Sequence, residues 1–294
     1  MTNFLQLTII GLGMGSIYAL LAVGFVLIYK SSKVLNFAHG QLVMMTAYFG
    51  ILVLVQMGVP IWVGLLLTIA LAGLLGAGVN RFLMRPMIGQ PLIATIMITI
   101  ALASVLSALC TMFWGGSTWR YPRFIPSAPA NIAGAAISQE VLYSSLVIMI
   151  LVILLSYFFY RTPWGLAMRS VAEDHQVAKS MGVNVNRVFM GAWILSGVII
   201  SIAGIILGHF LGVGPVLSEI GLKSLPAALI GGLESLPGAV IAGFLIGLAE
   251  TFAAGYIDPH VGGGTSSVFP YVLMIIVILL RPYGLLGTRK VERI

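Results

Sequence analysis

The chain has 294 residues, of which 60% are hydrophobic and only 8% are charged. Soluble domains carry roughly 25% charged residues, so this composition excludes an ordinary soluble domain and predicts a polytopic membrane protein. The formal net charge of +7 is compatible with nucleic-acid binding. However, the basic residues stand singly between apolar runs rather than together on one face. We therefore expect no nucleic-acid partner and interpret the charges as a signal of membrane topology.

The first apolar run covers residues 6–29. It is long enough to cross a bilayer, because about 20 helical residues span the hydrocarbon core. Small residues let membrane helices pack closely, and this run contains several of them: Gly11, Gly13, Gly15, Ser16 and Ala19. The run is also longer than the apolar core of a signal peptide. We expect it to remain as the first transmembrane helix.

A polar segment separates this run from the second, which continues to residue 57. It contains Asn36, His39 and Gln41. Hydrocarbon cannot satisfy their polar groups, so we expect them to face protein, a water-filled cavity or the membrane interface. One interpretation is a helix start with Asn36 as the N-cap, and the other is a role in a translocation path. We expect no metal site, because one His without an acidic or Cys neighbour supplies too few ligands.

The third run, residues 60–80, follows after a gap of two residues and predicts a tight hairpin. A polar turn with Arg81 and Arg85 leads to the fourth run, residues 92–114. Four hydroxyl residues lie close to one face of this predicted helix: Thr95, Thr99, Ser104 and Ser107. Such hydroxyls most often bond to backbone carbonyls or to neighbouring helices. The alternative is that Thr95 and Thr99 line a translocation path.

The second half contains predicted spans at residues 141–160 and 188–211 and a last apolar run at 268–280. Between them, Gly and Pro repeatedly interrupt residues 212–255, which favours broken or re-entrant helices over two complete spans. Glu234 and Glu250 lie in this stretch, either as functional ionisable groups at membrane depth or in water at helix ends. The sequence thus predicts an all-α polytopic membrane protein of about eight transmembrane helices. We expect one integral-membrane domain over residues 1–294.

The charge pattern predicts an orientation. With one crossing per run, one side of the membrane receives most of the basic segments, namely Lys30, Lys33, Arg81, Arg85, the loop at residues 161–187 and the tail with Arg289, Lys290 and Arg293. The other side receives Arg120, Arg123, Lys223, Glu140, Glu219 and Asp258. Because short cytoplasmic loops carry an excess of Lys and Arg, we expect the first side, with the C-terminus, to be cytoplasmic.

The loop at residues 161–187 is the one substantial polar island in the chain. Within it, residues 172–181 contain no helix breaker and end at Gly182, which suits a left-handed terminating position. Glu173 and Asp174 would lie in the first turn and Lys179 near the end, each matching the helix dipole. The pattern predicts one helix of about ten residues, roughly 15 Å long. This helix is either a solvated linker or a docking surface for another protein.

Five ordered motifs carry a resemblance that runs through nearly the whole chain. They are Gly-Ser-Ile-Tyr-Ala-Leu at 15–20, Leu-Asn-Phe-Ala-His-Gly at 35–40, Ala-Glu-Asp at 172–174 with Met-Gly-Val-Asn at 181–184, Gly-Gly-Leu-Glu-Ser-Leu-Pro-Gly-Ala at 231–239, and Arg-Pro-Tyr-Gly-Leu-Leu-Gly at 281–287. With these motifs the chain resembles the permease subunits of bacterial branched-chain amino acid ABC transporters, of the LivH type. Permeases for urea and short amides are similar to it, so the motifs specify the family better than the substrate.

The resemblance implies a multi-pass permease of the bacterial inner membrane that imports a small polar solute by alternating access, most readily a branched-chain amino acid. It also implies partners: a second permease subunit, homologous or identical, two cytoplasmic ABC ATPase subunits, and a periplasmic or lipid-anchored solute-binding protein. In such permeases a short cytoplasmic helix docks into the ATPase. Carried onto this chain, the coupling residues are Ala172, Glu173, Asp174, Gln176, Ala178, Lys179, Gly182 and Asn184.

The residues that line the translocation path do not follow from the resemblance. On their own chemistry, the candidates are Asn36, His39, Gln41, Thr95 and Thr99. No Gly-x-x-x-x-Gly-Lys-Ser/Thr motif occurs, so if ATP drives transport another chain must bind it. We expect no cofactor and no catalytic residue in this chain.

Two other classes of function are alternatives. An ion-coupled secondary transporter or facilitator would use Glu234 and Glu250 as proton carriers beside broken helices. An intramembrane enzyme would need a nucleophile and a base with plausible spacing. The histidines, at positions 39, 175, 209 and 260, are dispersed along the chain, and no such pair is evident.

Overall fold

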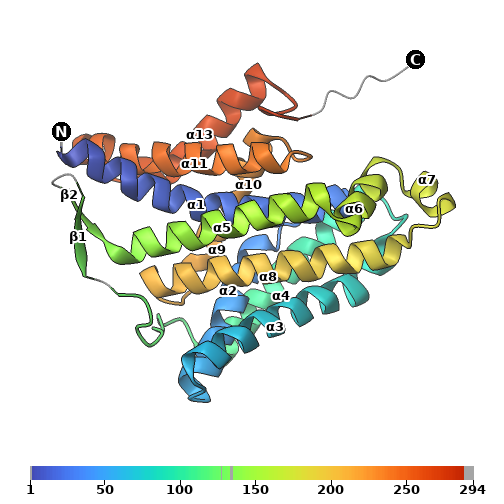
Figure 1. Cartoon of the computed structure of the whole chain (residues 1–294), viewed down its shortest axis with the longest axis horizontal. Coiled ribbons are helices and arrows are strands. Elements are labelled where there is room, and N and C mark those ends of the chain that lie inside the picture. The colour runs from blue at the N-terminus through green and yellow to red at the C-terminus, as the bar shows by residue number, and fades with distance from the viewer. Residues whose placement is uncertain (1, 127, 133–134, 288–294) are drawn as a thin grey trace. The chain divides into compact units, whose positions relative to one another are not determined.

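The computed structural model describes residues 2–126, 128–132 and 135–287 (Figure 1). Within these residues, 7 helices are long and apolar enough to cross a membrane, and the helix at Thr265–Leu280 is apolar but shorter. The strands described are β1 (Pro129–Ile132) and β2 (Ala135–Ser138), which form an antiparallel pair. The predicted all-α polytopic fold of about eight membrane helices is confirmed. The basic tail with Arg289, Lys290 and Arg293 lies outside the described residues.

The helices follow the apolar runs closely. Those before the polar island are α1 (Thr2–Ser32), α2 (His39–Gly50), α3 (Ile61–Val79), α4 (Leu92–Trp114) and α5 (Gln139–Arg161). The island forms α6 (Pro163–Glu173) and α7 (His175–Ser180), and it is followed by α8 (Val185–Leu211). The last helices are α9 (Val216–Leu222), α10 (Ser224–Gly231), α11 (Leu236–Phe252), α12 (Asp258–Val261) and α13 (Thr265–Leu280). π-Helical turns extend α2 to Gln56 and connect α11 to α12.

The chain folds into two compact units. Unit 1 contains residues 1–26, 125–156 and 223–294, and unit 2 contains residues 27–124 and 157–222. Unit 1 therefore holds the first part of α1, the strand pair and α10 to α13, whereas unit 2 holds α2 to α4 and α6 to α9. The chain passes between the units within α1, in the loop between α4 and β1, within α5, and between α9 and α10.

In unit 2, α3 and α8 lie side by side (Figure 1) and meet through small residues. A Cβ atom on Gly76 would lie 2.3 Å from the carbonyl oxygen of Trp193, and one on Gly197 would lie 2.5 Å from that of Ala72. A real Cβ cannot come this close to a backbone atom, so only glycine permits this approach. Close backbone contact through small residues is typical of membrane helices, which gain no hydrophobic driving force from lipid.

In unit 1, the small residues of the first helix have the role that the sequence predicts for them. A Cβ atom on Gly247 of α11 would lie 2.2 Å from the backbone nitrogen of Gly15. One turn away, a Cβ atom on Gly243 would lie 2.3 Å from the nitrogen of Ala19. Helix α1 is therefore packed backbone to backbone against α11, as expected of a transmembrane helix.

The Gly- and Pro-rich stretch after α8 forms broken helices, as predicted. Helix α9 has 7 residues and α10 has 8, far short of the roughly 20 that cross a bilayer. Between them the helix breaks at Lys223. After α10 the chain turns at Gly231 and Gly238, where a Cβ atom on Gly238 would lie 2.0 Å from the carbonyl oxygen of Gly231. Helix α11 then begins with Ser235 as its N-cap.

Candidate functional site

The polar segment before α2 folds into a tight turn. The Asn36 carboxamide oxygen accepts a hydrogen bond from the backbone N–H of Ala38, 3.1 Å away. The N-cap position belongs to Ala38, which makes no side-chain capping bond. The interpretation of Asn36 as the N-cap is therefore wrong, because its side chain closes a turn that ends before the helix begins. Asn36 and His39 are both buried.

The predicted hydroxyl face of α4 contacts this turn. Thr99 accepts a hydrogen bond from the backbone N–H of Phe37 at 3.3 Å, and its own hydroxyl donates to the carbonyl of Ile96 at 2.7 Å. The Thr95 hydroxyl donates to the carbonyl of Pro91, at the start of the helix. Both threonines are buried. Thr99 thus ties α4 to the entry of α2, and neither hydroxyl faces open solvent.

Gln41 lies apart from this buried group. It lines an open groove along α4 together with Ser104, Ser107 and Thr111. Its carboxamide oxygen has no hydrogen-bond partner among the described residues. Gly40 holds this part of α2 against α9, because a Cβ atom there would lie 2.1 Å from the carbonyl oxygen of Ser218. The residues flanking Gly40 are consequently fixed by a backbone contact that no larger residue would permit.

The polar island contains two short helices instead of the single predicted one. Helix α6 ends at Glu173, and Asp174 adopts an extended conformation with φ −151° and ψ 119°. Its carboxylate accepts hydrogen bonds from the backbone N–H groups of Gln176 and Val177, at 2.7 and 3.0 Å. Asp174 is therefore the N-cap of α7 and not a first-turn residue, because short Asp side chains favour caps over helix interiors. These bonds lower the pKa of the Asp174 carboxyl group.

The end of α7 follows the prediction. Gly182 has φ 84°, the left-handed conformation expected at a helix terminus. Asn184 then caps α8, its side chain accepting a hydrogen bond from the backbone N–H of Arg187 at 3.1 Å. The short helix thus begins at a side-chain cap and ends at backbone hydrogen bonds from Gly182 and Val183, where the glycine permits the reversal. These bonds define where α7 begins and ends. The helix is not part of any of the candidate membrane spans.

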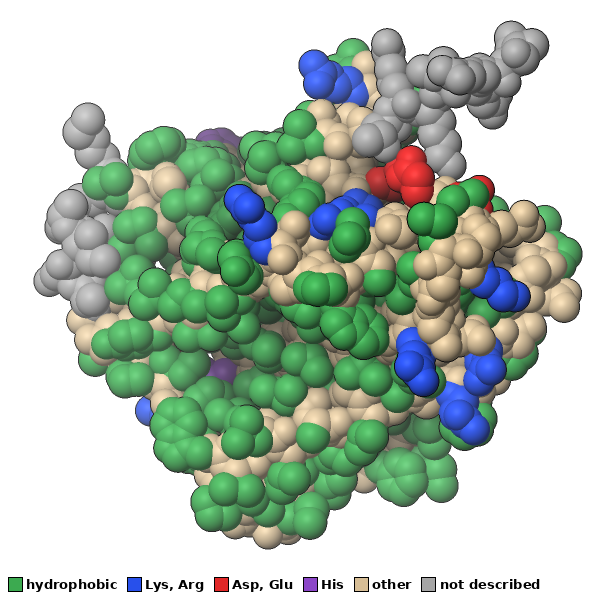
Figure 2. All heavy atoms as spheres, turned by 45° about the vertical axis from the view of Figure 1, so that its right-hand side comes forward, with side chains coloured by type: hydrophobic (Ala, Val, Ile, Leu, Met, Phe, Trp, Pro, Cys, Tyr) green, Lys and Arg blue, Asp and Glu red, His purple; other side chains and the backbone are tan. Residues whose placement is uncertain are grey.

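The exposed surface of α7 combines charged and apolar side chains. The small residues Ala172 and Ala178 are buried, whereas Glu173, Gln176 and Lys179 are exposed. Two apolar side chains are exposed as well, Val177 at 59% and Met181 at 80%. Figure 2 shows the face on which α6 and α7 lie, with Lys and Arg side chains against a largely hydrophobic surface. The sequence analysis missed Val177, because an isolated Val in a polar loop gives no signal of its own.

Several segments expected on one side of the membrane lie together in unit 2. The ends of α1 and α3, the start of α4 and helix α7 all contribute to one cavity of about 210 Å³. The polar or aromatic residues that line it include Lys33, Asn80, Gln90, Thr95, His175 and Trp193. Lys33 and the Arg81–Arg85 turn are thus at the same end of this unit as the polar island. The charge pattern predicted this grouping.

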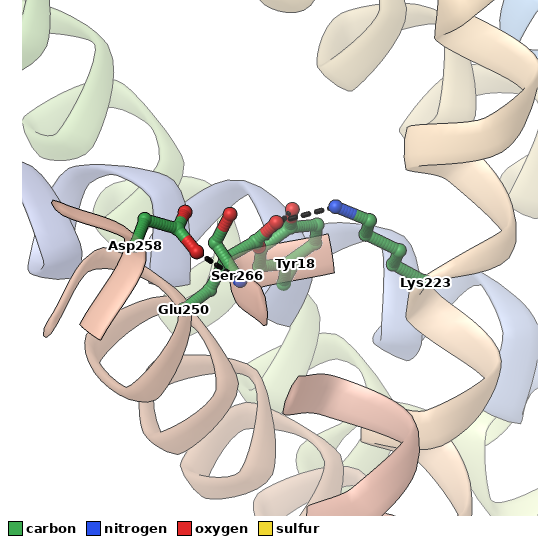
Figure 3. Close-up of polar contacts among 5 residues, drawn as sticks. All are labelled: Tyr18, Lys223, Glu250, Asp258 and Ser266. Atoms are coloured by element: carbon green, nitrogen blue, oxygen red, sulfur yellow. Dashed lines mark hydrogen bonds and ion pairs between the residues drawn. The ribbon is translucent and has the colours of Figure 1, made fainter. Parts of the chain in front are cut away.

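Unit 1 contains a cluster of charged residues that sequence reasoning did not find (Figure 3). The Tyr18 hydroxyl donates to one carboxylate oxygen of Glu250 at 2.5 Å, and Lys223 forms an ion pair with the other. The Lys223 and Glu250 side chains are only 13% and 16% exposed. Lys223 lies at the break between α9 and α10. Glu250 has fixed partners and does not lie in water at a helix end.

Figure 3 also shows Asp258, which the sequence analysis placed in an aqueous loop. Its carboxylate accepts hydrogen bonds from the backbone N–H groups of Thr265, at 2.8 Å, and of Ser266, at 3.4 Å. Thr265 and Ser266 lie in the first turn of α13. Asp258 therefore holds the preceding loop, which contains the glycines at 262–264, against the start of this helix. In the part of the chain that the structure describes, no group of three His, Cys, Asp or Glu side chains is arranged to hold a metal ion.

Two of the motifs that carry the family resemblance lie against each other in unit 1. The backbone N–H of Leu285 donates to the carbonyl of Ile230 at 2.7 Å, and that of Leu286 donates to Gly231 at 3.2 Å. Gly284 has φ 77°, and a Cβ atom there would lie 2.6 Å from the backbone nitrogen of Gly232. The segment after α13 thus packs on the turn between α10 and α11. This explains why both motifs are rich in glycine.

Comparison with known proteins identifies the family. Residues 7–278 match the model of the family described as "Branched-chain amino acid transport system / permease component". The chain belongs to this family. The permease is 28% identical over 313 residues to the high-affinity branched-chain amino acid transport system permease protein LivH of Escherichia coli (strain K12), covering 99% of this chain and 98% of the relative. It is also 28% identical over 306 residues to the corresponding protein BraD of Pseudomonas aeruginosa, with the same coverage.

A solved structure shows the same fold. It is described as PsaBC from Streptococcus pneumoniae in complex with Fab, and it matches with a TM-score of 0.52 over 95% of the permease and 92% of that chain. Since the two are only 14% identical, this likeness concerns the fold alone. Together with the family match, it confirms the resemblance and shows that the chain is a multi-pass transport permease whose relatives are not enzymes.

The structure brings together only part of the predicted path in this permease. The Asn36–Ala38 turn contacts Thr99, and His39, the next residue after the turn, is buried. Thr95, one helical turn before Thr99, lines the cavity of about 210 Å³. Gln41 faces the separate groove along α4. All of these residues belong to unit 2.

Because the Tyr18, Lys223 and Glu250 cluster joins residues far apart in the sequence, no local pattern pointed to it.

Proposed function

We propose that the permease is the membrane subunit of an ATP-driven importer for branched-chain amino acids. The family match over residues 7–278 and the full-length similarity to LivH and BraD support this substrate class. The chain lacks a phosphate-binding loop motif, so ATP hydrolysis belongs to partner subunits. Both units act as one permease domain in the bacterial inner membrane. The end of unit 2 that carries α7, and the C-terminus, face the cytoplasm.

The proposed assembly contains a second permease subunit, homologous or identical, and two cytoplasmic ATPase subunits. A periplasmic or lipid-anchored binding protein delivers the solute. The positive-inside rule supports this orientation, because Lys33, Arg81, Arg85 and the polar island lie at one end of unit 2. The ATPases would therefore meet the permease at α6 and α7.

One observation carries the ATPase coupling: α7 is an ordered, capped helix that exposes apolar side chains outside the membrane spans. A six-residue helix has little stability of its own, so its two caps and its buried Ala178 must hold it in place. Val177 and Met181 are exposed beside charged Glu173 and Lys179. An apolar pair rimmed by charge suits insertion into a groove of a partner protein. The coupling residues Ala172, Asp174, Gln176, Gly182 and Asn184 would position this surface.

The translocation path is proposed to pass the entry of α2. Polar atoms there have no hydrogen-bond partner among the described residues, namely the amide nitrogen of Asn36 and the carboxamide oxygen of Gln41. Buried polar groups are ordinarily satisfied, so exceptions suggest water or a solute that binds during transport. Together with His39, Thr95 and Thr99, these groups would contact the solute as α2 and α4 change their relative position in alternating access.

The test is uptake of labelled leucine by proteoliposomes that contain the permease, its partner ATPases and the binding protein. We expect uptake that requires ATP and persists when a protonophore abolishes the proton gradient at constant ATP. Urea and acetamide, offered in parallel, should not compete. Uptake by the permease alone, or uptake that follows the proton gradient, would instead establish a secondary transporter. Competition by urea or acetamide would move the substrate class to the amides.

A further inference from the structure

The cavity at the α7 end of unit 2 has the size of a site for a small molecule. Its volume is about 210 Å³. A water molecule occupies roughly 30 Å³ of liquid volume, so the cavity exceeds the space of a single bound water several-fold. Sites for drug-sized ligands measure about 300–1,000 Å³. The cavity is therefore smaller than such sites and suits a molecule of the size of an amino acid.

The chemistry of the lining selects one kind of ligand. Lys33, whose ammonium nitrogen also lies 5.7 Å from the ring centroid of Tyr29, supplies a positive charge, and no Asp or Glu is among the residues that line the cavity. The indole N–H of Trp193, whose side chain is 1% exposed, has no hydrogen-bond acceptor among the described residues. The remaining wall is largely apolar and includes Met84, Leu92 and Phe189. A cation and N–H donors beside an apolar wall match a carboxylate that carries an aliphatic side chain.

The cavity also contacts the coupling segment. His175, the first residue of α7, lines it. The His175 ring packs edge-on against Phe189 of α8, with 5.3 Å between the ring centroids, and its Nδ1 lies 2.6 Å from the carbonyl oxygen of Val171 in α6. A ligand in the cavity would therefore touch the residue that joins α6, α7 and α8. Its binding could change the position of α7 without any contact to the ATPase.

We propose that this cavity binds the branched-chain amino acid on the side of the coupling helix, through its carboxylate, and thereby slows transport when the solute accumulates there. The inference rests on the proposed function for the substrate and the orientation. It goes beyond that function by adding a site that makes the importer sensitive to its product. This site is separate from the groove along α4 and adjoins the proposed path at Thr95. Lys33 and Trp193 bind the carboxylate, the apolar wall holds the branched side chain, and His175 transmits occupancy to α7.

Binding is measured first, by equilibrium dialysis of labelled leucine against the purified permease in lipid nanodiscs. Unlabelled 4-methylpentanoate, which keeps the carboxylate and lacks the amine, should compete, whereas isoamylamine, which has only the amine, should not. Lys33→Asn removes the charge, and Asn tolerates the left-handed backbone of this position, φ 56°. Trp193→Phe removes the indole N–H together with one of the two rings, and keeps an aromatic ring at this buried position. We expect each variant to weaken binding roughly tenfold, the size expected for one charge-assisted hydrogen bond.

Arg81→Gln is the matched control, because Arg81 is an exposed cation of the neighbouring turn that does not line the cavity. It should bind leucine like the unaltered permease. Absence of leucine binding, competition by isoamylamine alone, or unchanged binding in both Lys33→Asn and Trp193→Phe would overturn the proposal. Trp193→Phe keeps the test decisive if the Lys33 variant fails to fold.

The regulatory step is tested with the complete transporter in proteoliposomes whose lumen contains ATP, with or without unlabelled leucine. Luminal leucine should lower the initial rate of labelled leucine uptake by the unaltered permease and by Arg81→Gln, but not by Lys33→Asn. If uptake is intact and luminal leucine has no effect, the inference fails while the proposed function stands. If no leucine uptake occurs at all, the proposed function fails, and the binding data alone decide whether the cavity takes a carboxylate.

Discussion

At the scale of single residues, the Glu250 carboxylate is the most informative finding. A lone ionisable residue at membrane depth suggests a proton carrier, and the sequence leaves that alternative open. In the structure the carboxylate contacts both Tyr18 and Lys223, and the charges are mostly buried. An ion pair of this kind gives Glu250 a structural role, because Lys223 lies where the helix breaks between α9 and α10. Sequence spacing could not reveal it, since the pair is 27 residues apart.

Removal of one partner should destabilise the permease more than removal of both. Lys223→Met leaves a buried, unpaired carboxylate, for which we expect a loss of about 3 kcal/mol in stability. The double variant Lys223→Met, Glu250→Met should recover most of that loss, because neither charge is then buried alone. The thermal unfolding midpoint in detergent measures this, with the exposed Lys179→Met as control. A double variant no more stable than Lys223→Met would show that the two residues do not act as a pair.

At the scale of elements, the helices were predictable and the exact position of the break in the polar island was not. Apolar runs of about 20 residues give the membrane helices, and the clustered Gly and Pro after residue 212 give the short α9 and α10. The sequence Ala-Glu-Asp at 172–174 fits a first helical turn as well as a helix end followed by an N-cap. Only the extended backbone of Asp174 distinguishes the two. The contact between residues 231–239 and 281–287 was equally invisible, since it depends on the tertiary fold.

The cap of α7 makes a prediction about pH. Because hydrogen bonds from Gln176 and Val177 lower the pKa of Asp174, its contribution to α7 is fully present above the ordinary Asp pKa of roughly 3.9. The contribution is lost as the pH falls through the lowered value. A 13C NMR titration of the Asp174 carboxyl group should give a midpoint below the ordinary value of roughly 3.9. Val177→Pro removes one N–H donor and should raise the midpoint, and an unshifted midpoint in the unaltered permease would argue against the cap.

The glycine contact between α1 and α11 should not tolerate a larger side chain. In Gly247→Leu, the new atoms would meet the backbone of Gly15, so we expect α1 and α11 to separate and little folded permease to accumulate. Gly78→Leu is the control, because a Cβ atom there meets nothing within 4 Å. Size-exclusion chromatography of the membrane extract reports the folded fraction. Equal yields of folded protein from both variants would contradict the close packing of α1 against α11.

At the scale of the whole molecule, the family match, the motifs and the geometry of unit 2 support one account. In the proposed account, the permease contributes the membrane path and ATPase subunits supply the energy through α7. The family follows from sequence similarity over residues 7–278. The coupling function of residues 172–184 stays a prediction, and the structure adds that Val177 and Met181 are exposed there.

The coupling ratio of the reconstituted transporter, leucine molecules imported per ATP hydrolysed, tests this account most directly. Val177→Asp combined with Met181→Asp places charges on the docking surface, and Gly182→Pro removes the left-handed turn that ends α7. Each should leave the permease inserted and reduce uptake at least tenfold relative to ATP hydrolysis, whereas Arg187→Gln, an exposed change beyond Asn184, should keep the normal ratio. An unchanged ratio in both α7 variants would contradict the claim that ATP drives this permease through α7.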